Sequence, residues 1–247
     1  MKTILVTGCS SGFGLETARY FLDRDWRVIA TMRRPDADVL PRSDRLRVLA
    51  LDVDDAASIR AAVAAAGPID VLVNNAGFGA AAPFETLPME AVRGMFETNT
   101  FGTMALTQAV LPQLRARGEG VVVNVTSSVT YRPVPLTAGY RASKAAVNAF
   151  TEVLAEEVAP FGVRAHLVLP GRAPETRFAD SARNHSQVAG SDAYAEMVRG
   201  VFAQFAGPGP VTRARDVAGA VWRAATDPGC PLHLPAGEDA LAWAGLA

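Results

Sequence analysis

The chain reads Thr-Ile-Leu-Val-Thr-Gly-Cys-Ser-Ser-Gly-Phe-Gly over residues 3–14. The β-branched and apolar run from Thr3 to Val6 predicts a buried strand, and the glycine-rich part after it predicts a turn that opens a helix. Gly8 permits a tight turn, Gly12 lets the backbone approach a pyrophosphate, and Gly14 allows close helix–sheet packing. A glycine-rich connection that merely turns the chain is the alternative. Its position directly after a first strand favours dinucleotide binding.

The rest of the chain alternates short β-rich runs with longer alanine-rich helical stretches. This alternation predicts an α/β fold, a doubly wound (Rossmann) parallel sheet of about seven strands with helices on both faces. The predicted strands are Thr3–Val6, Arg27–Thr31, Leu46–Leu51, Ile69–Val73, Gly120–Val125, Val163–Leu169 and Leu232–Leu234. The predicted helices run from the glycine turn to about Arg24 and then over Ala56–Ala66, Met89–Arg117 and Ala138–Val158.

No internal repeat or composition shift marks a second domain, so residues 1–247 are expected to form a single Rossmann domain. Between Pro170 and about Pro210 the periodicity weakens while Gly, Pro, Arg and Ser accumulate. We therefore predict a mobile segment with short helices, and a substrate lid at about residues 172–210.

Composition excludes several classes of protein. With 49% hydrophobic and 20% charged residues, the chain can bury enough apolar surface to fold. A net charge of −1 gives no bulk attraction to nucleic acid or to an anionic membrane. Two cysteines and three histidines lack metal-ligand spacing, so no metal site is expected. No long apolar run or cleavable leader is evident, which predicts a cytoplasmic protein.

The glycine spacing, Gly-x-x-x-Gly-x-Gly, is the first of several motifs. The others follow in order as Asp52-Val53, Asn74-Asn75-Ala76-Gly77, Asn99, Ser127, Tyr140-x-x-x-Lys144 and Pro170-Gly171. These motifs span nearly the whole chain, and through them the sequence resembles the compact form of the short-chain dehydrogenase/reductase family. The resemblance implies an NAD(P)-dependent oxidoreductase that moves a hydride between the nicotinamide and a carbonyl or secondary alcohol substrate, in a homodimer or homotetramer.

The resemblance also implies which residues contact the cofactor. They are Gly8, Ser10, Ser11, Gly12, Phe13, Gly14, Asp52, Val53, Asn75, Ala76, Gly77, Tyr140, Lys144, Pro170 and Gly171. Asp52 would contact the adenine amino group, with help in capping the next helix as the alternative. The segment 75–77 would line the adenosine side of the cleft, and the asparagine pair would also fix the end of a strand.

The end of the second predicted strand selects the nicotinamide cofactor. An acidic residue there would accept hydrogen bonds from the adenosine ribose, whereas an arginine pairs with a 2′-phosphate. In register with the family this position is Met32, followed by Arg33 and Arg34. Two arginines after a strand are also ordinary solvated surface. The missing carboxylate and the guanidinium of Arg33 together favour NADP(H) over NAD(H).

Tyr140 and Lys144 are four residues apart on a predicted helix and so share one face. Reduction of a carbonyl needs a proton donor, and a phenol with an ordinary pKa of about 10 is almost un-ionised at neutral pH. A cation about 4 Å away is expected to bring that pKa near neutrality. An exposed pair on a solvated helix is the alternative. Lys2 and Lys144 are the only lysines among 24 basic residues, which favours a specific role for Lys144.

Ser127 precedes Tyr140 by thirteen residues, the family spacing for the serine that orients the substrate oxygen, and Ser128 is the neighbouring alternative. Asn99 resembles the asparagine whose helix distortion holds a water between the lysine and solvent, although an amide that caps or kinks a helix is compatible. The resemblance thus implies that Tyr140 is the general acid in reduction and the base in oxidation. Lys144 would tune it and hold the ribose, and Asn99 would complete the proton path.

Two departures from the family concern the substrate pocket. Thr176 stands five residues after Gly171, whereas the family usually has a threonine four residues after, which argues against the usual contact with the nicotinamide amide. Thr130 stands where a glycine is common. Four further candidates to face the substrate are Tyr131, Arg132, Arg172 and Phe178.

Two other functions remain open from the sequence. A catalytically silent dinucleotide-binding regulatory protein would keep the glycine turn but leave Ser127, Tyr140 and Lys144 without a purpose. An epimerase or dehydratase related to the extended family members is disfavoured by the three-residue gap between the first two glycines and by the short C-terminal part.

Overall fold

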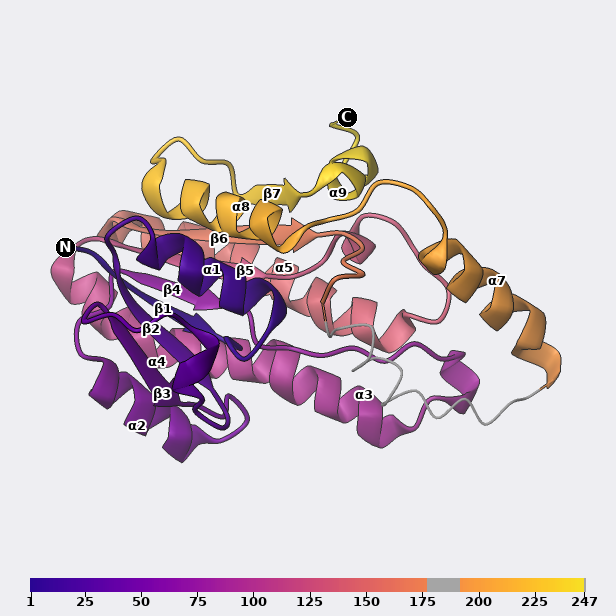
Figure 1. Cartoon of the computed structure of the whole chain (residues 1–247), viewed down its shortest axis with the longest axis horizontal. Coiled ribbons are helices and arrows are strands. Elements are labelled where there is room, and N and C mark those ends of the chain that lie inside the picture. The colour runs from indigo at the N-terminus through magenta and orange to yellow at the C-terminus, as the bar shows by residue number, and fades with distance from the viewer. Residues whose placement is uncertain (177–191, 247) are drawn as a thin grey trace.

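A computed structural model describes residues 1–176 and 192–246 of the chain. Its centre is a sheet with the strand order β3-β2-β1-β4-β5-β6-β7, in which every neighbouring pair is parallel (Figure 1). The strands are β1 (Thr3–Thr7), β2 (Arg27–Met32), β3 (Leu46–Ala50), β4 (Val71–Asn74), β5 (Gly120–Val125), β6 (Val163–Pro170) and β7 (His233–Ala236). The predicted Rossmann sheet of seven parallel strands is confirmed.

Helices cover both faces of this sheet (Figure 1). One face carries α1 (Gly12–Leu22) and α8 (Ala214–Thr226), and the other carries α2 (Ala56–Ala66), α4 (Gly102–Arg117) and α5 (Ala138–Val158). Successive residues of β1 serve the two layers in turn, because Ile4 and Val6 join the core under α1 and α8 while Leu5 joins the core under α2, α4 and α5. Burial on both faces explains why the inner part of β1 is apolar at successive residues.

Three shorter helices are α3 (Met89–Phe96), α7 (Ala195–Ala206) and α9 (Glu238–Trp243). The helical region predicted over Met89–Arg117 is present, and a π-helical turn, η3 (Glu97–Phe101), divides it into α3 and α4. No helix was predicted over α8, although its buried Val217, Val221 and Ala225 have helical spacing. Short 3₁₀ turns are η1 (Ala37–Val39), η2 (Phe84–Thr86), η4 (Ser128–Thr130), η5 (Ala159–Phe161) and η6 (Asp192–Tyr194).

β1 and β4 are neighbours in the sheet, so the connections after them leave toward opposite faces. In such sheets a ligand binds in the crevice at the carboxyl ends of the strands beside this switch point. Figure 1 shows α7 standing apart from the layered body. It falls in the segment where short helices were predicted, but residues 177–191 of the predicted lid lie outside the described residues. The lid and the single domain therefore stay predictions.

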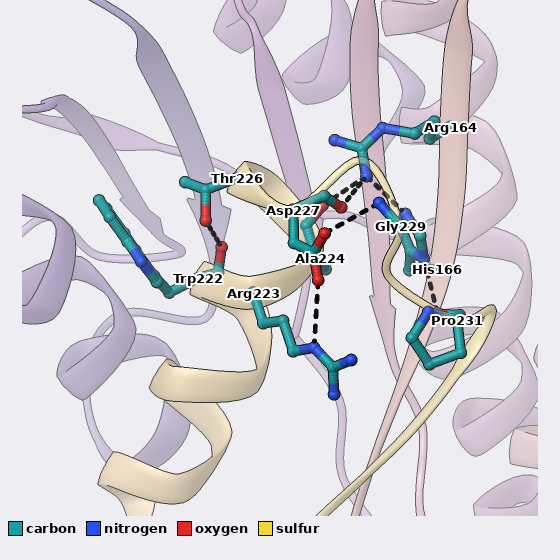
Figure 2. Close-up of polar contacts among 9 residues, drawn as sticks. All are labelled: Arg164, His166, Trp222, Arg223, Ala224, Thr226, Asp227, Gly229 and Pro231. Carbon is teal, nitrogen blue, oxygen red and sulfur yellow. Dashed lines mark hydrogen bonds and ion pairs between the residues drawn. The ribbon is translucent and has the colours of Figure 1, made fainter.

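The amino half of β6 is tied to the end of α8 (Figure 2). The Arg164 guanidinium donates to the backbone oxygens of Ala224 and Asp227 at 2.9 and 3.0 Å. It also lies 3.0 Å from Nε2 of His166. Because arginine only donates, Nε2 accepts and Nδ1 donates to the Pro231 oxygen at 2.9 Å, so His166 is neutral. Burial lowers the pKa of His166, and the Arg164 cation lowers it further.

Candidate active site

The loop between β1 and α1 has the conformation that its glycines predict. Gly8 and Gly12 have φ angles of +73° and +58°, which favour glycine. A Cβ on Gly14 would lie 2.5 Å from the Gly8 carbonyl oxygen, so this close approach requires glycine. Ser11 caps α1 without a side-chain hydrogen bond, Ser10 before it is exposed, and the first turn of α1 holds no acidic residue. The N–H groups at the start of α1 therefore fit an anion such as a pyrophosphate.

Thr7 at the end of β1 fixes the segment that follows β4. Its Oγ1 accepts hydrogen bonds from the backbone N–H groups of Asn75 and Ala76 at 2.9 and 2.8 Å. Its carbonyl oxygen accepts from Nδ2 of Asn75 at 2.8 Å. Nδ2 of Asn74 donates to Oδ1 of Asn124 on β5 at 2.8 Å. Both asparagines thus join the ends of neighbouring strands, which is the structural role expected for them.

Asp52 and Val53 follow β3 at the adenosine side of the predicted cleft. Oδ1 of Asp52 accepts from the backbone N–H of Asp54 at 3.2 Å, and Asp52 is half-buried. Asp55 caps α2, since its Oδ1 accepts from the backbone N–H of Ala57 at 2.7 Å. Val53 is buried. Asp55 is therefore the N-cap of α2, and Asp52 supports the backbone just before it.

The end of β2 carries no carboxylate. Met32 is its last residue and is buried. Arg33 and Arg34 are exposed, and neither has a hydrogen-bond or ion-pair partner in the described part of the chain. The two guanidinium groups therefore follow β2 without forming an ion pair among those residues.

The structure brings Ser127 and Tyr140 together. Ser127 caps η4 directly after β5, and Tyr140 lies in the first turn of α5. Both residues line the same cavity. Burial raises the pKa of Tyr140 to about 12, and a hydrogen bond with Ser127 opposes that rise. Ser128, the alternative serine, is fully buried beside it.

Lys144 follows Tyr140 by one turn of α5 and is also buried. Its Nζ donates to the carbonyl oxygen of Val125 at 2.9 Å, and a Cβ on Gly77 would lie 3.3 Å from it. Burial lowers the pKa of Lys144 to about 8. The expectation that the ammonium brings the Tyr140 pKa near neutrality is wrong for this arrangement, because burial disfavours both the phenolate and the ammonium.

Asn99 lies in the π-helical turn η3, so the helix distortion expected there is present. Its side-chain amide pairs with the backbone of Phe78, with Nδ2 donating at 2.9 Å and Oδ1 accepting at 3.0 Å. Nδ2 also donates to Oγ of Ser143 on α5 at 2.9 Å. The π-helical turn is thereby fastened to the helix that carries Tyr140 and Lys144. A role of Asn99 in proton transfer stays a prediction.

A cavity of about 320 Å³ lies beside Ser127 and Tyr140. Phe13 borders it near the glycine turn, and Pro170 and Gly171 border it after β6. Most of the remaining lining is apolar. This apolar lining comes from the loop after β4, from the segment before α5, and from the helices α7 and α9.

No group of three or more His, Cys, Asp or Glu residues in the described ranges is arranged to hold a metal ion. Within those same ranges, no helix has the length and apolar character needed to cross a membrane.

Comparison with known proteins identifies the family. Residues 2–187 match the family model described as short chain dehydrogenase. The chain belongs to the short-chain dehydrogenase family. It is 40% identical over 202 residues to the uncharacterized oxidoreductase YusZ of Bacillus subtilis, an alignment that covers 77% of this chain and 72% of YusZ. It is 37% identical over 195 residues to a 3-ketodihydrosphingosine reductase of Bacteroides thetaiotaomicron, covering 77% of this chain and 70% of that enzyme.

Solved structures of the short-chain dehydrogenase family agree with the fold. A short-chain dehydrogenase from Streptomyces avermitilis has a TM-score of 0.85 and 35% identity, covering 98% of this chain and 90% of that one. A serine dehydrogenase with NADP⁺ has a TM-score of 0.82 and 29% identity over 96% and 95% of the two chains. A 3-ketoacyl-(acyl-carrier-protein) reductase from Brucella melitensis with NADH has a TM-score of 0.79 and 26% identity over 95% and 96%. As a short-chain dehydrogenase, the chain is an NAD(P)-binding oxidoreductase that acts on a small molecule.

Only some of the residues predicted to face the substrate border the cavity in this short-chain dehydrogenase. Arg172 borders the cavity, as does Thr176, which packs 3.5 Å from where a Cβ on Gly12 would lie. Arg132 instead lies over the ring of Trp243 at 5.9 Å, and Tyr131 does not border the cavity. Phe178 lies outside the described residues.

Sequence reasoning missed the residues of α7 and α9 that border the cavity. They are Val201, Phe202, Phe205 and Ala206 of α7 and Trp243 of α9. A signal was available for α7, since Val198, Val201, Phe202 and Phe205 recur at the spacing of one helical face. No local signal marks Trp243, because its place depends on the path of the chain after β7.

Proposed function

We propose that this chain is an NADP(H)-dependent oxidoreductase that interconverts a carbonyl compound and a secondary alcohol through Ser127, Tyr140 and Lys144. The observation that carries the proposal is that the Ser127 and Tyr140 side chains line one cavity beside the glycine turn. Two hydroxyl groups that meet at a cavity can bind one substrate oxygen between them.

The residues present fit a nicotinamide dinucleotide. Gly8, Gly12 and Gly14 would admit the pyrophosphate to the start of α1, where no carboxylate opposes it. Asp52 would hold the adenine, and the segment 75–77 would line the adenosine. Lys144 would hold the ribose next to the nicotinamide. When bound, the nicotinamide supplies a hydride in reduction and accepts one in oxidation.

The preference for NADP(H) rests on this chain's own residues, because related solved structures contain NADP⁺ in one case and NADH in another. Met32, the last residue of β2, stands where an acidic residue would favour NAD(H), and Arg33 directly after it is exposed. A guanidinium pairs with a 2′-phosphate through parallel hydrogen bonds. The test is the ratio of kcat/KM for NADPH to that for NADH. A ratio above about ten is expected, and Arg33→Ser should lower it, whereas a preference for NADH would contradict the proposal.

Tyr140 provides the proton in the proposed reduction. A phenol whose pKa is raised to about 12 is fully protonated at neutral pH, which is the form that donates. Ser127 orients the substrate oxygen toward the phenol. Lys144, with its pKa lowered to about 8, is still about ten times more often an ammonium than an amine at pH 7. Asn99 would support the path by which Tyr140 regains its proton.

The decisive experiment follows NADPH absorbance with a panel of ketones and aldehydes for the wild-type protein and for Tyr140→Phe. The variant should lose about 10²- to 10⁴-fold in kcat, the usual contribution of a general acid. Its Kd for NADPH should stay within about twofold of wild type, since the ring is kept. Retention of wild-type turnover would contradict the proton role of Tyr140. Binding of NADPH with no turnover of any carbonyl would favour the regulatory alternative.

The proposal includes a homodimer or homotetramer of one-domain subunits. Sedimentation equilibrium measures the mass of the particle directly. A monomer at the concentration of the enzyme assay would contradict this part and leave the chemistry untouched.

A further inference from the structure

The helix α7 presents an apolar face that the protein core does not cover. Val198, Val201, Phe202 and Phe205 lie on one side of the helix at the i, i+3, i+4, i+7 spacing. No residue of α7 is fully buried, and these four are half-buried. Three of the four border the cavity beside Tyr140. The apolar face of α7 is therefore turned toward the cavity.

The wall opposite α7 is also apolar. Ala80 and Ala81 after β4 and Leu136 before α5 border the cavity, and Trp243 of α9 closes one side. The reacting hydroxyls of Ser127 and Tyr140 lie at this same cavity. A molecule bound there would have its polar group beside the two hydroxyls and its remaining surface against apolar side chains.

Arg172 is the one charged residue bordering the cavity among the described residues, and its charge is already engaged. Its Nη1 donates to the backbone oxygens of Phe205 and Gly207, at 2.5 and 2.8 Å. Its Nη2 donates to the oxygens of Gly209 and Pro210, at 3.3 and 3.5 Å. These carbonyl groups include the unpaired acceptors at the C-terminus of α7, which attract a cation. Arg172 thus caps α7.

The backbone of Arg172 is held as firmly as its side chain. Its N–H donates to Oδ2 of Asp239 at 2.5 Å. Thr212 Oγ1 accepts from the Gly171 N–H at 2.8 Å and lies 2.7 Å from Oδ1 of Asp239, to which it donates. A carboxylate or phosphate on the substrate would have to displace the carbonyl groups from Arg172 and release the end of α7. Arg172 is therefore a positioning residue that fastens α7 over the cavity.

We infer that the substrate is an uncharged ketone or aldehyde that carries an apolar chain or ring, with its carbonyl at Ser127 and Tyr140 and its apolar part against α7. This inference rests on the proposed function. In the reduction a hydride from NADPH forms the new C–H bond at the carbonyl carbon while the phenol of Tyr140 gives its proton to the oxygen. The products are the alcohol and NADP⁺, and solvent returns the proton to Tyr140.

The first arm of the test measures kcat/KM along the straight-chain methyl ketones from butanone to decanone. Each methylene that becomes fully buried should raise kcat/KM by up to about fourfold until the cavity is filled. The 2-oxo acids of the same chain lengths should be at least about tenfold poorer, because their carboxylate would be buried without a free cation. Equal or better turnover of the 2-oxo acids, or a flat chain-length series, overturns the inference and leaves the oxidoreductase proposal standing.

The second arm uses variants on α7. Phe202→Ala and Phe205→Ala should flatten the chain-length series, since both side chains border the cavity. Met197→Ala is the matched control, because Met197 is on the same helix, 47% exposed and away from the cavity. Arg172→Gln should flatten the series as well and should speed hydrogen exchange in residues 195–206. A selective loss of 2-oxo acid turnover in Arg172→Gln would instead make Arg172 a substrate-binding cation and overturn the inference.

The third arm does not need turnover. Binding of the same ketones to Tyr140→Phe is followed by the fluorescence of Trp243, with Trp243→Phe as the control for the signal of the other two tryptophans. Affinity that rises with chain length supports the inference even if no carbonyl is reduced, in which case the proposed function fails alone. Affinity that does not change along the series overturns the inference whatever the enzyme assay gives.

Discussion

The two sides of the crevice are held by different forces. The cofactor side is built from backbone close to the sheet, where Thr7 joins β1 to the segment after β4 and Gly14 allows α1 to touch β1. The substrate side is built from α7, which has no fully buried residue and is fastened by Arg172. The cofactor side thus depends on close backbone approach that leaves no room for side chains. The substrate side depends on a few hydrogen bonds. Substitutions should affect the two sides very differently.

The largest effect is expected from Gly14→Ala on the cofactor side. The new Cβ would lie 2.5 Å from the Gly8 oxygen and 2.6 Å from Nδ2 of Asn75, so the turn must shift. Overpacking of this kind costs about 1–3 kcal/mol of stability. We expect the Kd for NADPH to rise by at least about tenfold, because the same turn meets the pyrophosphate.

Isothermal titration with NADPH and urea denaturation measure the two effects of Gly14→Ala. The control is Gly219→Ala in α8, where no atom lies within 4 Å of the added Cβ. That variant should bind NADPH normally. Equal behaviour of the two variants would show that the cofactor side tolerates side chains and would remove the contrast.

A smaller effect is expected from Asp239→Asn on the substrate side. The amide keeps one acceptor oxygen for the Arg172 N–H, but its NH2 group then faces Thr212 Oγ1, whose single hydrogen must turn to the Ala236 oxygen at 2.7 Å. The charged acceptor is lost, and a hydrogen bond to a neutral acceptor is weaker by about 1 kcal/mol. KM for the carbonyl substrate should rise by up to about tenfold while the Kd for NADPH stays within about twofold.

Steady-state kinetics and NADPH titration separate these two outcomes for Asp239→Asn. Glu238→Gln, an exposed neighbour on α9, is the matched control and should change neither. An equal loss of NADPH binding in Asp239→Asn would mean that the loop after β6 serves both sides of the crevice alike.

The same contrast explains what the sequence alone could predict. The cofactor side was predictable because its signals are local, as in the glycines at 8, 12 and 14 directly after an apolar strand. The pairing of Tyr140 with Lys144 follows from one helical turn. Their pKa values were not predictable in this way. Burial decides them, and it depends on β5, the loop after β4 and the cavity, all distant in the sequence.

On the substrate side, the lining residues of α7 and α9 were not predictable from the sequence for the same physical reason. α7 borders the cavity because Arg172, 33 residues before Phe205, binds its last carbonyl groups. Trp243 reaches the cavity from the opposite end of the chain. The helix distortion at Asn99 was predicted from the family resemblance, but its contacts with the Phe78 backbone and Ser143 were not, because they join segments distant in the sequence.

A third prediction concerns the pH dependence of folding stability, which should change without a matching change in NADPH binding. His166 lies in the amino half of β6, and its pKa is lowered in the folded protein from an ordinary value of 6.5. The unfolded chain therefore binds the proton first, so stability should fall as the pH drops below about 6.5 and level off below the folded pKa. The free energy of unfolding should change by less than about 1.4 kcal/mol per pH unit, which is the slope for binding of one whole proton.

Thermal unfolding from pH 7.5 to 5.5 measures this slope, and His166→Gln should reduce it. NADPH affinity per folded molecule should not follow the same curve, because the hydrogen bonds of the His166 ring within the described part of the chain go to Arg164 and Pro231. An unchanged slope in the variant would assign the acid sensitivity to another group.

The smallest expected effect is that of Gly200→Ala on α7, and it has the opposite sign to Gly14→Ala. No atom lies within 4 Å of the added Cβ, and Gly200 is in the middle of an exposed helix. Alanine favours a helix over glycine by about 1 kcal/mol, so the variant should order α7 more fully. If α7 is held mainly by Arg172 and by the bound substrate, this gain lowers KM for an apolar ketone by up to about fivefold with kcat and NADPH binding unchanged. A KM that does not move while hydrogen exchange in α7 slows would mean that α7 is already ordered before substrate binds, and the difference between the two sides of the crevice would then be one of composition and not of stability.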